Sequence, residues 1–448
     1  MRPKKYSVYL NHKIKPFKKI ITVDSDKSLS IRSFLIGSIS NKFSFAKNVL
    51  ESEDVFSTIQ ACRKLGIKII KLKPGKYKIF GKGLGCFYAK RNTYIDFGNS
   101  GTLARLMIGI LSTTPNINLN VKGDHSLNKR SMGELIHVMS KFGATFLPKK
   151  KFKFPLKIIS SPMPVGINYK AGVSAQIKSA VIFAGLNSYG NTNIIVQKQS
   201  RDHTENLLKN NKQTIKIKKG VNKEIIIIGK KYLNPINTEI PGDISSSAFF
   251  SALTIMSKNT EIKIKNVGLN PTRTGFYQIL KKANANIKFS NLVKKNNEVS
   301  ADISVKSSKI RPLNTESKYY VSATDEYPIL FVIAALTKGI SIFKGISDLK
   351  NKESDRIKEM QKVLKQIGIK TSAGNGSLKI FGKGMIDASD KKIDVPNLGD
   401  HRICMASFVL AILTGAKTKI KNFETVNSSS PSFLKIMKKL GAKFEIRK

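Results

Sequence analysis

The sequence predicts an α/β protein built from six repeated units of roughly 75 residues each. Three observations support this prediction. An apolar helix pattern recurs six times, an amphipathic helix pattern followed by a strand-like segment also recurs six times, and two segments are almost identical. The similar pair is KIFGKGL at 78–84 and KIFGKGM at 379–385, in the first and fifth units. Because both helices of a unit need an apolar surface to cover, the pattern favours helices packed on sheets.

Each unit is expected to contain one helix that is buried on most sides. Its sequence has a polar start, often Ser, Asp or Asn, followed by an almost continuous apolar body. Such polar residues are good N-caps, and an apolar body without a polar face indicates burial all round. These helices are predicted within 26–39, 99–112, 174–188, 243–257, 325–339 and 400–415.

Each unit is also expected to contain an amphipathic helix that ends in Lys, then Gly or Asn, and then a short strand. Gly and Asn tolerate the left-handed conformation that ends many helices, and a cationic last turn complements the helix dipole. These helix–strand segments are predicted at 61–70, 139–147, 207–217, 280–289, 364–371 and 437–446.

The six units are expected to form two domains of three. The segment Glu239–Gly242 divides the third unit from the fourth, and the strand-like residues 19–23 belong to no complete unit. Those residues could complete the distant C-terminal half. The predicted domains are therefore 25–241, and 1–24 together with 242–448.

The composition is typical of a folded, soluble protein, with 41% hydrophobic and 24% charged residues. No apolar run approaches the about 18 residues that span a bilayer. The basic N-terminal segment lacks the apolar core of a secretory signal. The three cysteines, at 62, 86 and 404, are too few and too scattered for a disulfide framework or a zinc site, so a cytoplasmic location is expected.

The formal net charge of +50 is the most unusual global feature. A polyanionic partner such as nucleic acid would explain it, because Lys and Arg neutralise phosphates. The alternative is a lysine-rich composition spread over solvated faces. Lys, Asn and Ile are frequent along the whole chain and Trp is absent, which favours this alternative. Nucleic-acid binding beyond non-specific attraction is therefore not expected, although the positive potential would attract small anionic substrates.

The candidate chemistry lies at the starts of the apolar helices. If the helices of one domain run parallel, their N-termini present free N–H groups and partial positive charge on one face, which suits phosphates and carboxylates. Capping explains any single polar residue there, but it does not explain the Lys or Arg that repeatedly follows the cap. The residues concerned are Lys27, Ser28, Arg32, Asn99 to Thr102, Arg105, Ser174, Gln176, Lys178, Asp243, Asp325, Glu326, Asp400, His401 and Arg402.

Other motifs indicate structure rather than chemistry. The glycines of FGKGLG (80–85) follow a strand and open no convincing helix, so we interpret them as turn residues rather than a dinucleotide-binding fingerprint. Cys404 lies inside an apolar helix and is interpreted as a core residue. The five His residues are dispersed and no metal-ligand cluster emerges. No metal and no cofactor are expected.

Eight segments, in order and at matching spacing, resemble the 5-enolpyruvylshikimate-3-phosphate synthases, and their spellings are most similar to the bacterial class II branch. They are DKSLSIRSFLIGSI, GNSGTLARLMIGIL, SLNKRSMG, SAQIKSAVIFAGL, SRDHTE, TDEYPIL, NKESDRI and GDHRICMA. The resemblance covers Pro16 to the C-terminus. It implies a two-domain inside-out α/β barrel of six units, with the N-terminal strand returning to the C-terminal domain and the ligands in a cleft that closes over them.

The same resemblance implies transfer of the enolpyruvyl group of phosphoenolpyruvate to shikimate 3-phosphate, with release of phosphate. This is a step of the shikimate pathway to chorismate and the aromatic amino acids, in which the partners are the two small-molecule substrates and no membrane is involved. A monomer is expected. The residues implied for shikimate 3-phosphate are Lys27, Ser28, Arg32, Ser174, Ala175, Gln176, Arg201, Asp325 and Lys352. Those implied for phosphoenolpyruvate are Lys27, Asn99, Gly101, Arg130, Gln176, Arg356 and Arg402.

The reaction needs two proton transfers. We expect Asp325 to accept the proton of the attacking hydroxyl, Glu353 to donate a proton to the methylene carbon, and Lys27 to assist either step. The donor role requires a protonated Glu353, which desolvation could favour despite the nearby Arg356. On its own, the Glu353–Arg356 spacing would also suit an ordinary i,i+3 pair on a solvated helix.

The sequence departs from the family at Ser428, where many relatives carry a Lys that reaches phosphoenolpyruvate. Gly101 leaves room for the inhibitor glyphosate, so inhibition is expected. Three rivals remain for the function. The first is UDP-N-acetylglucosamine enolpyruvyl transferase, which carries a loop Cys that segment 123–133 lacks. The second is a non-enzymatic polyanion-binding protein. The third is a paralogue with the same fold and an altered acceptor.

Overall fold

The computed structural model describes residues 5–90, 93–220 and 223–448. The chain forms two compact units, and from here on the first unit and the second unit mean these two parts of the chain rather than the six sequence repeats. The first unit comprises the N-terminal segment through Asp24, Pro241–Val293 and Val299–Lys448, and the second comprises Ser25–Ile240 and Lys294–Glu298.

The described residues form six four-stranded sheets, three in each unit. Each sheet contains one parallel strand pair and at least one antiparallel pair, so the same connection pattern recurs six times. The second unit contains three sheets, whose strands are given in spatial order. One sheet consists of β14 (Asn237–Glu239), β3 (Phe43–Lys47), β5 (Lys76–Phe80) and β4 (Ile69–Lys73), and another of β6 (Tyr94–Asp96), β7 (Asn118–Lys122), β9 (Leu156–Ile159) and β8 (Thr145–Leu147). The third consists of β10 (Asn168–Ala171), β11 (Asn191–Val196), β13 (Lys223–Gly229) and β12 (Ile215–Gly220).

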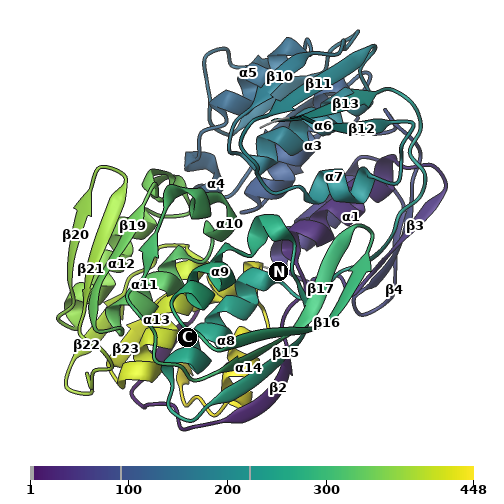
Figure 1. The fold of residues 1–448 in the computed structure, drawn as a ribbon. Helices are drawn as coiled ribbons and strands as arrows, with labels where there is room; N and C mark the ends of the chain where they lie inside the picture. The colour runs from purple at the N-terminus through teal and green to yellow at the C-terminus, as the bar shows by residue number, and fades with distance from the viewer. Residues whose placement is uncertain (1–4, 91–92, 221–222) are drawn as a thin grey trace. The chain divides into compact units, whose positions relative to one another are not determined.

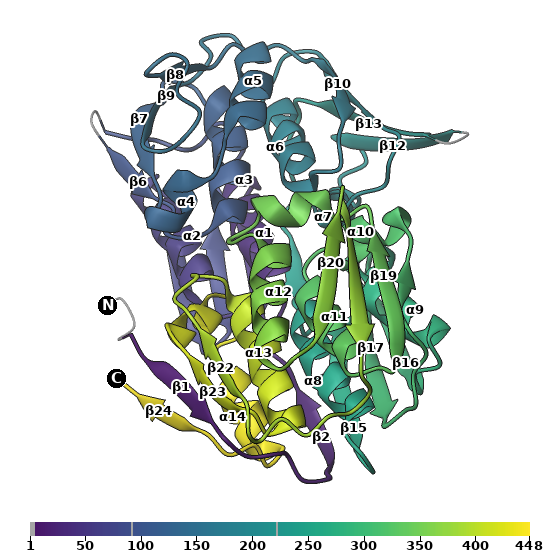
Figure 2. The same cartoon turned by 90° about the vertical axis from the view of Figure 1, so that its left-hand side faces the viewer.

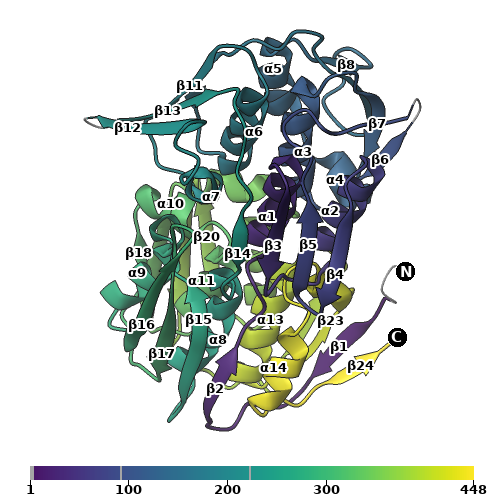
Figure 3. The same ribbon diagram turned by 90° about the vertical axis from the view of Figure 1, so that its right-hand side faces the viewer.

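The first unit repeats this arrangement with the help of the N-terminal segment. One of its sheets consists of β16 (Ile287–Lys295), β17 (Glu298–Lys306), β15 (Glu261–Gly268) and β2 (Lys18–Thr22). Another consists of β18 (Asn314–Thr315), β19 (Gly339–Lys344), β21 (Ser377–Gly382) and β20 (Lys370–Gly374). The third consists of β22 (Lys392–Val395), β23 (Lys417–Ile420), β1 (Ser7–Leu10) and β24 (Glu445–Arg447). Strand β2 confirms the strand predicted at 19–23. Sequence reasoning missed β1, which pairs with both β23 and β24 near the C-terminus (Figure 2). The pairing of β2 with β15 is visible in Figure 3.

The six apolar helices are present where the sequence predicts them (Figure 1). They are α1 (Lys27–Ile39), α3 (Gly101–Thr113), α6 (Ala175–Leu186), α8 (Ile244–Met256), α11 (Tyr327–Ala335) and α13 (His401–Thr414). In five of them the preceding residue caps the helix, with its side chain accepting a hydrogen bond from a first-turn amide; these caps are Asp26, Ser100, Ser174, Asp243 and Asp400. The exception is α11, where Glu326 makes no such capping bond.

Five of the six amphipathic helices are confirmed, and each is followed by a strand; the helix predicted within 207–217 is instead α7 (His203–Leu208), which ends at Leu208, is mostly buried and has no basic residue in its last turn. The five confirmed helices are α2 (Glu53–Lys64), α5 (Gly133–Lys141), α9 (Gly275–Lys282), α12 (Arg356–Gln366) and α14 (Phe433–Lys439). The remaining helices are the short α4 (His125–Lys129) and α10 (Tyr320–Ala323), and the 3₁₀ turns η1 (Pro271–Arg273), η2 (Ser317–Tyr319), η3 (Ser347–Asn351) and η4 (Phe423–Ser428).

The near-identical KIFG segments have a packing role that the sequence did not reveal. A Cβ on Gly81 would overlap the Ser40 carbonyl oxygen after α1, and a Cβ on Gly382 would overlap the Thr337 carbonyl oxygen after α11. The glycine therefore lets a strand approach the end of the buried helix in both units. Turn geometry holds only for the later glycines of the motif, such as Gly83 with φ of 88°.

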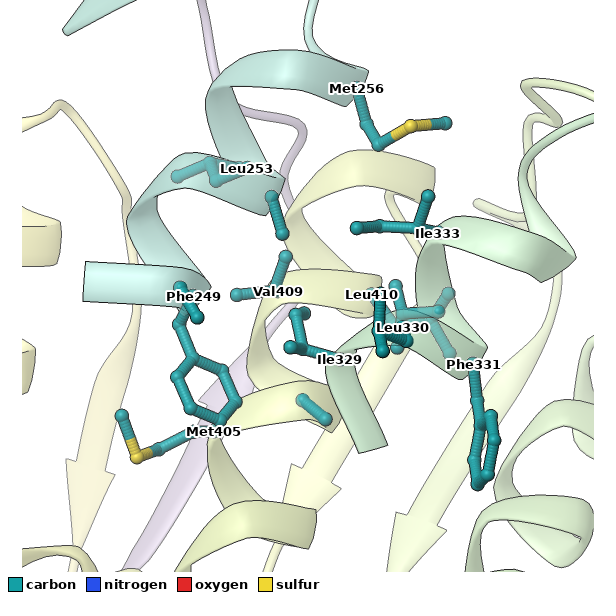
Figure 4. Packing of buried hydrophobic residues seen from close by; sticks show 14 of the residues in the cluster. Phe249, Leu253, Met256, Ile329, Leu330, Phe331, Ile333, Met405, Val409 and Leu410 are labelled. Atoms are coloured by element: carbon teal, nitrogen blue, oxygen red, sulfur yellow. The ribbon is translucent and has the colours of Figure 1, made fainter. Parts of the chain in front are cut away.

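Each unit buries its own apolar cluster. In the first unit the cluster is centred on α8, α11 and α13, as Figure 4 shows for Phe249, Ile329 and Val409. Because these helices are apolar all round, packing against both neighbours and sheets satisfies every face. Their polar first turns are thereby held by rigid elements.

Candidate active site

The start of α1 holds the first group of predicted site residues. Asp26 Oδ1 accepts a hydrogen bond from the Leu29 amide at 2.8 Å, which fixes the first turn. Lys27 Nζ lies 2.9 Å from the buried Asp54 Oδ2, so the flexible lysine is held by an ion pair. Ser28 contributes its carbonyl oxygen, which accepts from Arg32 Nη1 at 3.0 Å.

A second group joins the starts of α3 and α6. Gln176 Oε1 accepts from Arg105 Nη1 at 2.7 Å, and Gln176 Nε2 donates to Thr102 Oγ1 at 2.9 Å. Ser174 caps α6, and Ala175 is its first residue. These bonds fix the Gln176 amide between the two helices.

Asn99, Gly101 and Arg130 lie together in the same unit. Arg130 Nη2 donates to Asn99 Oδ1 at 3.1 Å, and Asn99 Nδ2 donates to Asp124 Oδ2 at 2.9 Å. A Cβ on Gly101 would lie 3.0 Å from Arg105 Nη1 and 3.1 Å from Arg130 Nη1. The glycine therefore allows two guanidinium groups to gather at the start of α3.

Arg32 is buried, with 3% of its surface exposed, and its direct partners are uncharged. Its Nε donates to Thr204 Oγ1 at 2.8 Å, its Nη2 donates to Ser179 Oγ at 3.2 Å, and its Nη1 donates to the Ser28 carbonyl. A guanidinium has five N–H donors. One N–H on each Nη therefore makes no hydrogen bond to a described residue.

Charged groups of both signs surround the buried Arg32. Burial lowers the pKa of Arg32 to about 10, the Glu205 and Asp26 carboxylates act to raise it, and the nearby Arg201 lowers it. Two guanidinium groups that repel each other gain from an anion placed beside them. Arg32 and Arg201, two of the residues that sequence reasoning selected for a phosphate, are therefore close enough to interact.

In the first unit Arg356 collects three carboxylates. It is almost fully buried, and its Nη2, Nε and Nη1 lie 2.6 Å from Glu353 Oε2, 3.0 Å from Asp400 Oδ2 and 3.5 Å from Asp325 Oδ1. Burial alone would lower the pKa of Arg356, but Asp400, Glu353 and Asp325 together raise it above its usual value. The predicted Glu353–Arg356 pair is present, although Glu353 precedes α12 rather than lying on one helical face with Arg356.

Lys352 belongs to the same segment and is held by an acid that the sequence did not single out. Asp348 Oδ2 lies 2.7 Å from Lys352 Nζ and accepts a hydrogen bond from the Tyr320 hydroxyl, also at 2.7 Å. The Tyr320 hydroxyl therefore helps to orient the Asp348 carboxylate, and Asp348 in turn holds the Lys352 ammonium group.

Arg402 differs sharply from Arg356. Its side chain is buried, with 4% of the residue exposed, and the guanidinium lies 5.8 Å from the Phe249 ring centroid. Its Nε and Nη1 atoms are buried without a hydrogen-bond partner among the described residues. Ser428 donates to the Thr425 carbonyl oxygen at 2.8 Å, so the hydroxyl is engaged within its own turn.

Five Lys or Arg side chains are buried among the described residues: Arg32, Lys178, Arg273, Arg356 and Arg402. Lys178, Arg273 and Arg356 each make a direct ion pair with a buried carboxylate, from Glu205, Asp243 and Asp400 respectively. Arg32 and Arg402 make no direct ion pair with a described carboxylate. Each compact unit therefore contains one buried guanidinium that makes no direct ion pair with a described carboxylate, which is a costly arrangement for a buried cation.

Sequence reasoning missed the residues that hold these groups, including Asp54, Asp124, Thr204, Glu205 and Asp348. One signal was present, because a Lys at 178 inside an otherwise apolar helix requires a buried partner. Among the described residues no group of three or more His, Cys, Asp or Glu is arranged to hold a metal ion. Within the same residues, no helix is both long and apolar enough to cross a membrane.

Known proteins are similar to this chain over nearly its whole length. A family model described as EPSP synthase (3-phosphoshikimate 1-carboxyvinyltransferase) matches residues 11–437. A protein named 3-phosphoshikimate 1-carboxyvinyltransferase from Paramagnetospirillum magneticum is 34% identical over 424 residues, which is 94% of each chain. A protein of the same name from Zymomonas mobilis is 34% identical over 449 residues and 99% of each chain.

Solved structures show the same similarity. The EPSP synthase from Acinetobacter baumannii has a TM-score of 0.85 and 32% identity, with 99% of this chain and 100% of that chain covered. The enolpyruvyl transferase NikO from Streptomyces tendae, at 11% identity and a TM-score of 0.73, supports the fold alone. The predicted fold, an inside-out α/β barrel built from six repeated units, is thereby confirmed.

Proposed function

The chain belongs to the EPSP synthase family, the 3-phosphoshikimate 1-carboxyvinyltransferases, and from that premise we propose how its residues perform the reaction. The enzyme transfers the enolpyruvyl group of phosphoenolpyruvate to the 5-hydroxyl of shikimate 3-phosphate and releases phosphate. This addition–elimination proceeds through a tetrahedral intermediate and serves the shikimate pathway. The observation that carries the proposal is the pair of buried guanidinium groups, Arg32 and Arg402, that lack a carboxylate partner.

Shikimate 3-phosphate is assigned mainly to the second unit. Arg32 keeps one N–H on each Nη for the ligand, and Arg201 adds positive charge beside it. Guanidinium groups bind phosphate and carboxylate oxygens with two parallel hydrogen bonds, which fixes the orientation of the ligand. The other proposed contacts are Lys27, Ser28, Ser174, Ala175 and Gln176 from this unit, and Asp325 and Lys352 from the first unit.

Phosphoenolpyruvate is assigned to cations of both units. Arg402 has buried N–H groups that no described residue accepts, which suits a carboxylate or phosphate ligand. The other proposed contacts are Lys27, Asn99, Gly101, Arg130, Gln176 and Arg356. Because Ser428 supplies no charge where many relatives have Lys, Arg402 carries a larger share of the anion binding here than in those relatives.

The two proton transfers are assigned to carboxyl groups that share one guanidinium. Asp325 accepts the proton of the 5-hydroxyl as its oxygen attacks C2 of phosphoenolpyruvate, and Glu353 donates a proton to C3. Lys27 assists either step. Loss of a methyl proton with expulsion of phosphate then completes the elimination.

The ion pair of Glu353 with Arg356 bears on this assignment. A guanidinium 2.6 Å away favours the charged carboxylate, whereas donation requires the protonated form. An anionic substrate that engages the N–H groups of Arg356 brings further negative charge close to Glu353, which favours the protonated form of this carboxyl. We therefore assign proton uptake by Glu353 to the step in which phosphoenolpyruvate binds.

The assembly and location belong to the same proposal. We assign two domains, 25–241 and 1–24 with 242–448, and the two compact units support this division. We assign a monomer in the cytoplasm, supported by three cysteines that form no disulfide. Sedimentation at micromolar concentration tests the monomer, and a dimer mass would refute it.

The central experiment measures phosphate release from phosphoenolpyruvate with either shikimate 3-phosphate or UDP-N-acetylglucosamine as the acceptor. We expect release only with shikimate 3-phosphate, and a loss of more than about a hundredfold in kcat for Glu353→Gln. Glu359→Gln on α12 is the matched control, because the part-buried Glu359 pairs with the exposed Lys362 and belongs to no proposed contact. It should retain full activity.

Two outcomes would contradict the proposal. Release with the nucleotide sugar alone would make the acceptor assignment wrong. Equal kcat in Glu353→Gln and Glu359→Gln would remove Glu353 from the proton transfer while leaving the family assignment intact.

A further inference from the structure

The short helix α7 carries three consecutive buried polar side chains, and each has a different buried partner. His203 Nδ1 lies 2.8 Å from Glu298 Oε1, Thr204 Oγ1 accepts from Arg32 Nε at 2.8 Å, and Glu205 Oε1 lies 2.6 Å from Lys178 Nζ. All three side chains are at most 3% exposed. The six-residue helix also buries Leu207 and Leu208 in the apolar cluster, so polar contacts and apolar packing together fix where it lies.

The Lys178–Glu205 pair is unusual because a lysine is rarely buried. Lys178 and Glu205 have side-chain exposures of 2% and 3%, and the lysine projects from the apolar body of α6. Burying two charges gives little net stability even when they pair, because the desolvation cost offsets the attraction. A role in stability alone is therefore a weak explanation for the pair.

The pair lies next to the hydrogen bonds that orient Arg32. Ser179, the residue after Lys178, accepts from Arg32 Nη2, and Thr204, the residue before Glu205, accepts from Arg32 Nε. The hydroxyls of Ser179 and Thr204 are also hydrogen-bonded to each other at 2.8 Å. Because the ion pair joins α6 to α7 one residue away from both acceptors, it sets the spacing between them.

We propose that Lys178, Thr204 and Glu205 are positioning residues, which join α6 to α7 and thereby aim the Arg32 guanidinium at shikimate 3-phosphate. The inference rests on the proposed function of Arg32 and adds three residues, none of which was assigned a ligand contact. Glu205 also supplies negative charge that keeps the buried guanidinium protonated. The two N–H groups of Arg32 that have no acceptor among the described residues are thus charged and held in one direction.

Thr204 offers the cleanest test, because Val has the same shape without the acceptor and Ser keeps the hydroxyl. Loss of a hydrogen bond to a charged group typically reduces binding by about tenfold or more. We expect Thr204→Val to raise KM for shikimate 3-phosphate about tenfold, with kcat and KM for phosphoenolpyruvate changed less than about twofold. Thr204→Ser should restore the wild-type KM.

The ion pair is tested with the double variant Lys178→Met/Glu205→Gln, because either single change would leave a buried charge unpaired. We expect this double variant to fold, to melt within a few degrees of the wild type, and to raise KM for shikimate 3-phosphate about tenfold. Thr114→Val is the matched control, because the buried Thr114 hydroxyl donates only to Ile110 O of its own helix. It should lower the melting temperature without a change in either KM.

The outcomes separate this inference from the proposed function. No phosphate release by the wild type, or an unchanged KM for shikimate 3-phosphate in Arg32→Ala, would refute the role of Arg32 itself. A raised KM in Arg32→Ala, with unchanged KM in both Thr204→Val and the double variant, would refute the positioning role alone. Equal increases in KM for both substrates would also refute it, because a general loss of structure explains them.

Discussion

The substitution Asp400→Asn tests whether a buried carboxylate fixes the Arg356 guanidinium. Asp400 is fully buried and accepts hydrogen bonds from Arg356 Nε at 3.0 Å, Ser354 Oγ at 3.0 Å and the Arg402 amide at 2.9 Å. Asn has the same shape and can still cap α13 with its carbonyl oxygen. Its NH₂ group then faces Arg356 Nε, so a donor opposes a donor and the guanidinium loses a counter-charge.

The magnitude follows from the contacts that remain. Breaking a buried ion pair by removing one partner costs about 3–5 kcal/mol. Glu353 and Asp325 still lie beside the guanidinium, and the helix cap is retained, so the lower limit applies. We expect the free energy of unfolding to fall by about 3 kcal/mol. The poorly fixed Arg356 should also lower kcat/KM for phosphoenolpyruvate about tenfold or more.

Urea denaturation followed by far-UV circular dichroism measures the stability, because the chain has no Trp to report by fluorescence. Asp355→Asn is the matched control. Asp355 caps α12 through a hydrogen bond from the Lys358 amide at 3.0 Å and makes no ion pair with a described residue. Asn caps a helix as well as Asp does, so this variant should lose less than about 0.5 kcal/mol. Equal stability of the two variants would refute the role of Asp400.

Three further predictions follow from single positions. Gly81→Ala should lower the free energy of unfolding by about 3 kcal/mol or more, because its Cβ would overlap the Ser40 carbonyl oxygen. The control is Gly190→Ala, where φ is 71° and no atom lies within 4 Å of the added Cβ, and it should lower the free energy of unfolding by only about 1 kcal/mol. Equal losses in the two variants would contradict the packing role of Gly81. Gly101→Ala should raise KM for phosphoenolpyruvate several-fold and weaken glyphosate inhibition, because its Cβ would press on two guanidinium groups; unchanged steady-state kinetics and inhibition would refute this. Burial raises the pKa of Cys86 to about 11, so only about a thousandth of this thiol is ionised at pH 8. Labelling of Cys86 by a disulfide reagent should therefore be slow in the native chain and fast in urea. Fast labelling of Cys86 in the native chain would contradict this prediction.

The helices were predictable because their signals are local. A polar cap followed by an apolar body, and a cationic last turn followed by Gly or Asn, lie within about 15 residues of sequence, and both patterns recur six times. Caps such as Asp26 and Asp400 are correct to the residue. The α11 cap was the exception, because Glu326 accepts a hydrogen bond from the Ser245 hydroxyl instead of capping the helix.

The residues that position the site were not predictable, because their partners are far apart in the chain. Arg32 and Thr204 are separated by 172 positions, and Arg356 and Asp400 by 44. A single sequence carries no signal for such pairs except that a buried charge must have a partner. The strand β1 was missed for the same reason, since its neighbours β23 and β24 lie at the other end of the chain.

The net charge of +50 is explained by where the two kinds of charge lie. Of the 79 Lys and Arg residues, five are buried in the described structure, whereas nine of the 29 Asp and Glu residues are buried. The basic excess is therefore a property of the surface, and the scarce acids are concentrated in the interior. Those buried acids include Asp54, Glu205, Asp243 and Asp400, each of which pairs with a cation.

Because the acids are concentrated in the interior and the excess bases on the surface, the charges at the candidate site do not depend on the net charge of the chain. Exchanging surface residues for Lys changes the long-range potential, which is screened by salt, but it leaves the buried pairs as they are. Among the buried cations, only Arg32 and Arg402 make no direct ion pair with a described carboxylate, which is why we propose both as anion-binding groups. A chain of this composition can therefore keep a site specific for small anions without becoming a protein that binds polyanions at that site.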